Sequence, residues 1–302
     1  MSSLAQTEPP TAHAARSGLF GSAPLWRILL LAGLSLWLYG STIAHLVAQW
    51  WHDPNFSHGF FVPLFAAFVV WQERDRLALL PLRPSWLGLP ILLAALALAL
   101  LGQLGAEIFT SRLSLLLLLA GVIVLFQGWI LFRALLFPWF LLFLMIPIPA
   151  IIFNQITFPL QLLASKVAAA VLSIAPFGAP LVPVFREGNI IHLPAMDLAV
   201  VEACSGIRSL TSLVTLAIIY GYLLEKRIWV RWVLALASVP IAIAANSVRI
   251  IGTGLLVQYW DADKAEGFFH ASWGIIIFIV SLLMLYALHA LIRLLWRERE
   301  AP

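Results

Sequence analysis

Long, almost uncharged hydrophobic segments recur along the whole chain, and they constrain its fold more than any other feature. A helix needs about 20 apolar residues to cross the hydrocarbon core of a bilayer, where every backbone polar group must find its partner within the protein. Of the 302 residues, 62% are hydrophobic and 11% are charged, whereas soluble domains are roughly 45–50% apolar and about 25% charged. The sequence therefore predicts an all-α, polytopic membrane protein.

We expect about eight transmembrane helices. The second hydrophobic segment is short for a crossing, and in the fifth the prolines of "MIPIPA" are expected to break the helix near its outer end. The segments lie near residues 26–47, 59–72, 86–104, 113–131, 134–152, 206–224, 230–256 and 272–296.

Three further segments are not expected to be simple crossings. Residues 1–24 are polar and lack a signal-peptide pattern, which predicts a disordered cytoplasmic tail before a membrane domain of residues 25–298. Residues 154–174 are amphipathic, so they could cross or lie in the interface. Residues 175–204, with prolines, glycines and β-branched runs, predict an outer segment of short strands and turns.

The positive charges indicate the orientation, because Lys and Arg accumulate in cytoplasmic loops. With the N-terminus inside and 154–174 not crossing, 12 of the 18 basic residues lie on the cytoplasmic side. We therefore favour an interfacial or re-entrant path for 154–174, and expect a multi-pass protein of the cytoplasmic (inner) membrane with both termini in the cytoplasm. The net charge of +4 then reflects topology, and no nucleic-acid partner is expected. The 12 residues are Arg16, Arg27, Arg74, Arg76, Arg83, Arg133, Lys226, Arg227, Arg231, Arg293, Arg297 and Arg299.

This topology brings three chemically capable residues to one depth, at the outer (periplasmic) face. Cys204, the only cysteine, precedes the crossing 206–224, and His270 precedes the last crossing. Arg249 lies about 27 Å along a helix that starts near Arg231. An ionisable group within a transmembrane helix is costly, and it therefore indicates function.

These three residue types could serve as a cysteine nucleophile, a general acid/base and an oxyanion stabiliser. A helix N-terminus and the nearby Arg208 would lower the pKa of the Cys204 thiol. His270 could accept the thiol proton and later deliver it to a leaving amine. Arg249 could stabilise an oxyanion or hold the main chain of a substrate.

Five polar residues near these three are expected to support them. Arg208 is a supporting cation or headgroup anchor, Glu202 a local partner for an arginine, and Asn246 precedes Arg249 in "NSVRI". Asp53 and His58 lie in the loop "WWHDPNFSHGFF" on the same outer side, where an aromatic belt with a polar turn is the plainer interpretation.

We expect no metal and no cofactor. A single cysteine excludes a Cys-rich metal site and an intrachain disulfide. His52, Asp53 and His58 lack the i, i+4 spacing of a helical zinc pair.

Other interpretations stay open on the residues alone. Cys204 could be a small apolar residue of a helix, Arg249 could extend to lipid headgroups, and His270 could be an interfacial histidine. The chain could accordingly be a transporter or flippase for an anionic lipid or glycan, or a non-catalytic scaffold of an envelope polysaccharide-assembly complex. A transporter would need polar residues toward both faces, whereas here they gather at one.

Four stretches in order carry a resemblance that covers about residues 26–296: "WWHDPNFSHG", "FLMIPIP", "EACSGIRS", and the pair "NSVRI" with "FFHASWG". The chain resembles the exosortase/archaeosortase family of multi-pass cysteine transpeptidases. The resemblance implies a catalytic triad of Cys204 in "ACSG", Arg249 in "NSVR" and His270 in "FFH". The histidine is similar to the bacterial branch of the family.

The resemblance also implies the partners and the reaction. Substrates would be exported proteins with a C-terminal tripartite signal: a Pro-Glu-Pro-type motif, one transmembrane helix and a basic cluster. The enzyme would cleave near the motif through a thioacyl intermediate on Cys204, and release or transfer the protein. The acceptor nucleophile, whether water, an amine or a glycan, and the oligomeric state are not specified by the sequence.

Overall fold

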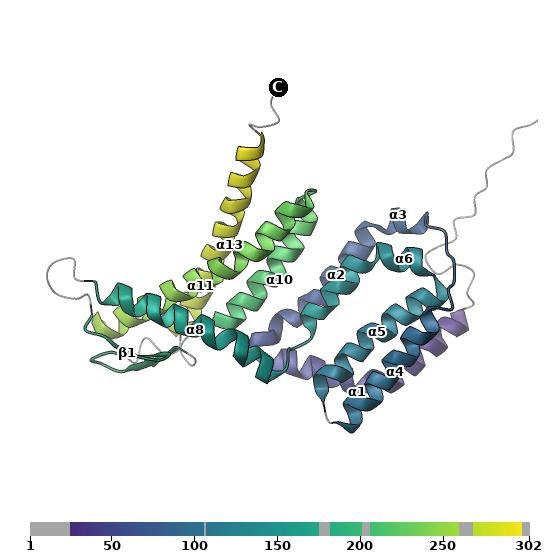
Figure 1. Ribbon diagram of the computed structural model, residues 1–302, viewed down its shortest axis with the longest axis horizontal. Coiled ribbons are helices and arrows are strands. Elements are labelled where there is room, and N and C mark those ends of the chain that lie inside the picture. Colours follow the sequence, from purple (N-terminus) through teal and green to yellow (C-terminus); the bar gives the residue numbers. More distant parts are fainter. Residues whose placement is uncertain (1–24, 106, 175–181, 201–205, 260–267, 298–302) are drawn as a thin grey trace, which may run out of the picture. The chain divides into compact units, whose positions relative to one another are not determined.

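Most of the described chain is helical, as the need to satisfy backbone hydrogen bonds within a lipid-embedded chain requires. The computed structural model describes residues 25–105, 107–174, 182–200, 206–259 and 268–297 (Figure 1). These residues form two units. Unit 1 contains the described residues up to Leu46 and Pro63–Phe143, and unit 2 contains Val47–Val62 and the described residues from Leu144 onward.

The boundaries of the units fall within α1, α2 and the 3₁₀ helix η2. Unit 1 contains parts of α1 (Leu25–His52), α2 (Phe61–Gln72) and η2 (Leu142–Met145), with α3 (Arg74–Ala78), α4 (Gly88–Leu104), α5 (Ile108–Phe126), α6 (Trp129–Ala134) and α7 (Leu136–Leu141). Unit 2 contains the 3₁₀ helix η1 (Pro54–Phe60), α8 (Ala150–Leu172), β1 (Phe185–Glu187), β2 (Ile190–His192), β3 (Asp197–Ala199), α10 (Gly206–Leu224), α11 (Ile228–Tyr259) and α13 (Phe268–Arg297).

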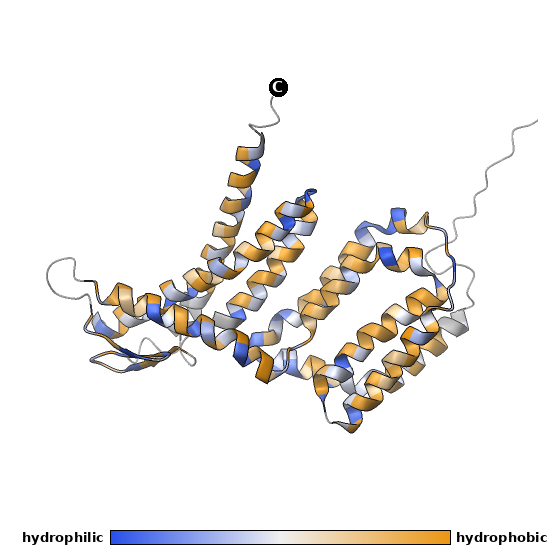
Figure 2. Ribbon diagram, in the orientation of Figure 1, coloured by the Kyte–Doolittle hydropathy of each residue, from blue (hydrophilic) through white to orange (hydrophobic). Residues whose placement is uncertain are grey.

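A polytopic membrane fold is confirmed. Among the described residues, six helical segments are long and apolar enough to cross a bilayer, and Figure 2 shows apolar residues predominating along them. Three shorter apolar helices accompany them, so the expected number of eight crossings is not reproduced one for one. The six are Leu29–His52, Pro54–Gln72, Ile108–Phe126, Ala150–Leu172, Ile228–Tyr259 and Gly274–Trp296, and the shorter three are Gly88–Leu104, Leu136–Met145 and Arg208–Leu224.

The bounds expected for the fifth crossing, 134–152, are wrong. The helical chain here consists of the short helices α6, α7 and η2 and stops at Met145. It resumes at Ala150, with Pro149 as the extended residue before α8. Proline lacks an amide donor and fixes its own φ, so the expected break of the helix at Pro147 and Pro149 is confirmed.

Helix α8 covers most of the amphipathic segment 154–174 and turns a polar stripe toward the protein. Thr157, Gln161 and Ser165 recur every fourth residue and all three are buried, as side chains on one helical face would be. By length and composition α8 is long enough to cross a membrane. The interfacial path favoured by the charge distribution therefore stays a prediction.

A small antiparallel sheet follows α8. The strands pair in the order β1–β2–β3, and Gly188, with φ +60°, turns the chain between the first two (Figure 1). Ile191 and Leu198 are buried in one apolar cluster with Ala168 of α8 and Ile250 of α11. The expected strands and turns of 175–204 are thus confirmed for the described residues 182–200.

Helices α10, α11 and α13 form the second cluster of unit 2. Leu213 and Ala217 of α10, Leu234 of α11 and Leu285 of α13 are all buried in it. Small residues at such contacts let helices approach closely where lipid removes the hydrophobic drive for association.

In unit 1, Gly128 follows α5 and contacts the backbone of Arg83, in the segment that precedes α4. Its φ of +98° is in the region that favours glycine, and a β-carbon there would overlap the carbonyl group of Arg83, with which Gly128 forms an isolated bridge. The amide of Arg83 also donates to the carbonyl of Gln127 over 3.1 Å.

We predict that Gly128→Ala lowers the free energy of unfolding by about 2 kcal/mol, because both the strained φ and the overlap must be accommodated. The measurement is thermal unfolding of the purified protein in detergent. Gly33→Ala is the matched control, since a β-carbon at Gly33 meets no other atom within 4 Å and alanine favours a helix interior. Equal melting temperatures for the two variants would contradict the prediction.

Candidate active site

The loop between α1 and α2 is held in a defined turn by its own residues. Asp53 precedes η1, and its carboxylate accepts a hydrogen bond from the backbone N–H of Asn55 over 2.9 Å. Pro54 occupies the first position of the turn, where no amide donor is needed. Gly59 is buried, and a β-carbon there would overlap the indole ring of Trp50. Asp53, expected to support the site, therefore has a capping role here.

Two hydrogen bonds tie this loop to the proline-rich segment that precedes α8. The indole N–H of Trp50 donates to the carbonyl of Met145 over 2.9 Å. His58 Nε2 donates to the carbonyl of Leu144 over 3.2 Å. The stretches "WWHDPNFSHG" and "FLMIPIP", 95 residues apart at Trp50 and Met145, are thus brought into direct contact.

The same loop also contacts the first turns of α10. The hydroxyl of Thr211 lies 3.4 Å from the carbonyl oxygen of Asn55 and 3.3 Å from that of Arg208. Arg208 itself is exposed. The loop consequently lies beside the first turns of α10, the helix that begins at Gly206.

Arg249 of α11 lies against α13. A β-carbon built on Gly274 would be 3.6 Å from Nη2 of Arg249 and 3.7 Å from its Cζ. His270 precedes Gly274 by four residues in α13, so both lie on one face of this helix. The helix contact that holds Arg249 therefore lies one turn along α13 from the backbone of His270.

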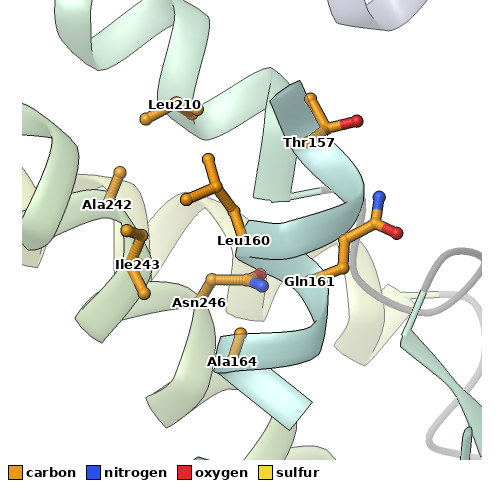
Figure 3. Close-up of a pocket in the computed structure, with 8 residues that line it drawn as sticks. All are labelled: Thr157, Leu160, Gln161, Ala164, Leu210, Ala242, Ile243 and Asn246. Carbon is orange, nitrogen blue, oxygen red and sulfur yellow. The ribbon is translucent and has the colours of Figure 1, made fainter. Parts of the chain in front are cut away.

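Asn246 is buried one turn before Arg249 and faces α8 (Figure 3). It lines a small cavity of about 30 Å³ together with Leu210 of α10 and Leu160 and Gln161 of α8. In Figure 3 the amide of Asn246 points toward α8, whereas the amide of Gln161 points away from Asn246. Asn246 thus lies where α8, α10 and α11 meet.

Cys204 and Glu202 lie outside the described residues. The described chain before them ends at Val200, whose N–H donates to the carbonyl of Asn189 over 3.0 Å, and it resumes at Gly206, where α10 begins. Of the expected triad, the side chain of Arg249 is described and His270 is placed by its backbone alone.

Sequence reasoning missed three residues that join these stretches. The sequence did not show that Trp50 is buried and Trp51 exposed; their exposed fractions are 7% and 77%. Thr211, two residues after "EACSGIRS", and Gly274, the last residue of "FFHASWG", were not singled out, although small and hydroxyl-bearing residues are usual at close helix contacts. Among the described residues no group of three His, Cys, Asp or Glu side chains could hold a metal ion.

The arrangement offers a cation at the contact between α11 and α13. A guanidinium in such a partly buried position can donate several N–H groups to a carbonyl or anionic oxygen. All of these contacts join residues of unit 2.

We predict that Trp50→Phe lowers the free energy of unfolding by about 1–3 kcal/mol, because the carbonyl of Met145 loses its donor in a buried place. Trp51→Phe is the matched control, since Trp51 is mostly exposed. Thermal unfolding in detergent measures both. If the two variants melt together, the indole hydrogen bond does not hold this loop.

A family model described as transmembrane exosortase (Exosortase_EpsH) matches residues 50–287. The matched region contains all four stretches, from Trp50 through Gly274. Searches of curated proteins and of solved structures gave no match.

Proposed function

Because this chain belongs to the transmembrane exosortase family, we propose that it is a membrane-embedded cysteine transpeptidase that acts on exported proteins. The family match is the observation that carries the proposal. Support comes from two sets of contacts within unit 2. The loop at Asp53 and His58 contacts the segment before α8 and the start of α10, and Arg249 lies against Gly274 of α13.

In the proposed reaction, Cys204 is the nucleophile. His270 accepts the thiol proton, and the thiolate attacks a carbonyl carbon of the substrate main chain. Arg249 donates N–H groups to the resulting oxyanion. When the intermediate collapses, the C–N bond breaks, His270 returns the proton to the leaving amine, and a thioester remains on Cys204. Water or an amine then attacks the thioester and restores the thiol.

The assignment of the oxyanion role to Arg249 over Arg208 has a structural basis. Arg249 is partly buried and its guanidinium lies against the backbone of α13, one turn from His270. Arg208 is exposed in the first turn of α10. A cation held by packing loses less of its strength to water than an exposed one. Arg208 is better suited to attract an acidic residue of the substrate.

The substrate proposed here is an exported protein with a C-terminal Pro-Glu-Pro-type motif, a transmembrane helix and a basic cluster. Its helix would lie in the bilayer beside the bundle, which would bring the motif to the end of α10 where Cys204 resides. The glutamate of the motif would be attracted to Arg208. The released fragment would be the helix with its basic cluster.

We also propose that this site faces the outside of the cytoplasmic membrane and that both termini lie in the cytoplasm. The opposite ends of α10 and α13 carry Lys226, Arg227 and Arg293. Their concentration at one end supports this orientation by the positive-inside rule.

We predict that Cys204→Ala and Cys204→Ser both abolish processing of a reporter with a C-terminal motif, helix and basic cluster. The chain and the reporter are co-expressed, and the reporter's size is followed on a gel. Equal shortening by wild type and both variants would contradict the cysteine nucleophile and favour a transporter or a scaffold. Membrane levels of each variant are compared by immunoblot as the control.

We further predict that Gly274→Leu lowers the processing rate at least tenfold, because its side chain would occupy the place of the Arg249 guanidinium. Gly274→Ala is the matched control. Its β-carbon would stand 3.6 Å from Nη2, an ordinary contact, and a rate within twofold of wild type is expected. A Leu variant as active as the Ala variant would mean that the position of Arg249 does not matter for the reaction.

A further inference from the structure

A second polar region lies at the far end of the α10–α11–α13 bundle, away from the candidate active site. Tyr220 follows Gly206 by 14 residues and His289 follows Gly274 by 15, which is about 20 Å along α10 and α13 at 1.5 Å per residue. A cavity of about 770 Å³ opens there, lined by residues from the end of α10, the α10–α11 turn and the last turns of α13. This volume is within the range of roughly 300–1,000 Å³ that ligand sites have.

One wall of the cavity is a chain of three hydrogen-bonded side chains. The hydroxyl of Tyr220 lies 2.7 Å from Nδ1 of His289, and Nε2 of His289 lies 3.2 Å from Oε2 of Glu225. The side chains of His289 and Glu225 are only 4% and 11% exposed. Since a carboxylate only accepts, Nε2 of His289 donates its hydrogen to Glu225, and the hydroxyl of Tyr220 shares a hydrogen bond with Nδ1.

Both oxygens of Glu225 are engaged inside the protein. Oε1 accepts the backbone N–H groups of Lys226 and Arg227 over 2.8 and 3.1 Å, while Oε2 meets His289. Burial raises the pKa of Glu225, but the hydrogen bonds from Arg227 and His289 outweigh it and lower the pKa below its usual value. Glu225 is therefore a carboxylate whose charge is compensated locally.

The remaining charges at the cavity are positive. Among its described lining residues, Glu225 is the only acid, whereas Arg227 and Arg293 are cations. Arg293 is exposed, and the exposed Tyr286 adds a hydroxyl group. The cavity therefore suits a ligand that carries negative charge and hydrogen-bond acceptors, and it disfavours a basic peptide.

The cavity lies where the helices leave the apolar region. The apolar segments end at Leu224 and Trp296, and Figure 2 shows polar residues at the α10–α11 turn. Trp296 lines the cavity and packs against Trp229, with ring centroids 4.8 Å apart. Tryptophan and arginine at a helix end are typical of the depth at which lipid headgroups lie.

We propose that this cavity binds the phosphate-bearing headgroup of an anionic membrane phospholipid. The guanidinium of Arg293 receives the phosphate, since a guanidinium fork matches phosphate oxygens. The hydroxyl of Tyr286 adds a donor. The apolar rim at Leu224 and Trp296 contacts the first carbons of the acyl chains. The hydrogen bonds among Tyr220, His289 and Glu225 join α10 to α13 and hold the wall of the cavity in place.

The test uses the full chain, purified in a non-ionic detergent and freed of lipid. Binding of short-chain phosphatidylglycerol, short-chain phosphatidylcholine and inorganic phosphate is titrated separately by microscale thermophoresis. We expect phosphatidylglycerol to bind at least tenfold more tightly than either of the other probes. Arg293→Gln should weaken its binding at least fivefold. Arg133→Gln, an arginine beside Trp129 in unit 1 and outside the cavity, is the matched control and should leave it unchanged.

Several outcomes would overturn the proposal. Equal loss of affinity in Arg293→Gln and Arg133→Gln would mean nonspecific charge attraction. Equal affinity for inorganic phosphate and phosphatidylglycerol would assign the site to a soluble phosphate. Tighter binding of the zwitterionic phosphatidylcholine would show that the negative charge of the lipid does not determine binding. Melting temperatures of the lipid-free variants verify folding, and Trp296→Ala, which should weaken lipid but not phosphate binding, tests the apolar rim in the same series. These readouts do not depend on the proposed transpeptidase activity.

Discussion

The packing of α11 against three other helices is the interaction on which the rest of unit 2 depends. α8, α10 and α13 each contact this one helix. Within a bilayer, helices associate through close packing rather than through a hydrophobic drive, so small residues matter. A β-carbon on Gly254 would already stand 3.0 Å from Leu172 of α8. Ala217 and Ala242 serve the same purpose between α10 and α11.

As a consequence, α11 helps to position polar side chains in two places along its length. Near one end, Arg249 meets Gly274 and Asn246 faces α8. At the other, the turn that leads into α11 carries Glu225 to His289 of α13. Buried polar groups in an apolar surrounding are costly when unpaired, so these contacts favour one arrangement of the helices.

Much of the fold could be predicted because hydrophobicity and proline act locally. Apolar runs predicted the membrane helices, and the prolines at 147 and 149 predicted the break before α8. The bounds 134–152 failed because a continuous apolar run does not say where a helix is interrupted, and α6 and α7 are separate helices. The amphipathic character of residues 154–174 was visible in the sequence. Periodicity alone does not distinguish a polar face turned to water from one buried in the protein, as Thr157 and Gln161 are.

The sequence by itself determined that the chain is a helical membrane protein, because hydrophobicity is a property of each side chain and does not depend on the tertiary structure. It also predicted a common depth for Arg249 and His270, since helix rise converts residue number into distance, and this depth stays a prediction. Only the tertiary structure decided that Arg249 lies against Gly274, that Trp50 rather than Trp51 holds the loop, and that Tyr220, Glu225 and His289 join into one chain. Those contacts link residues far apart in the chain through the rotation of each helix about its axis, and that rotation is set by the packing of side chains against neighbouring helices.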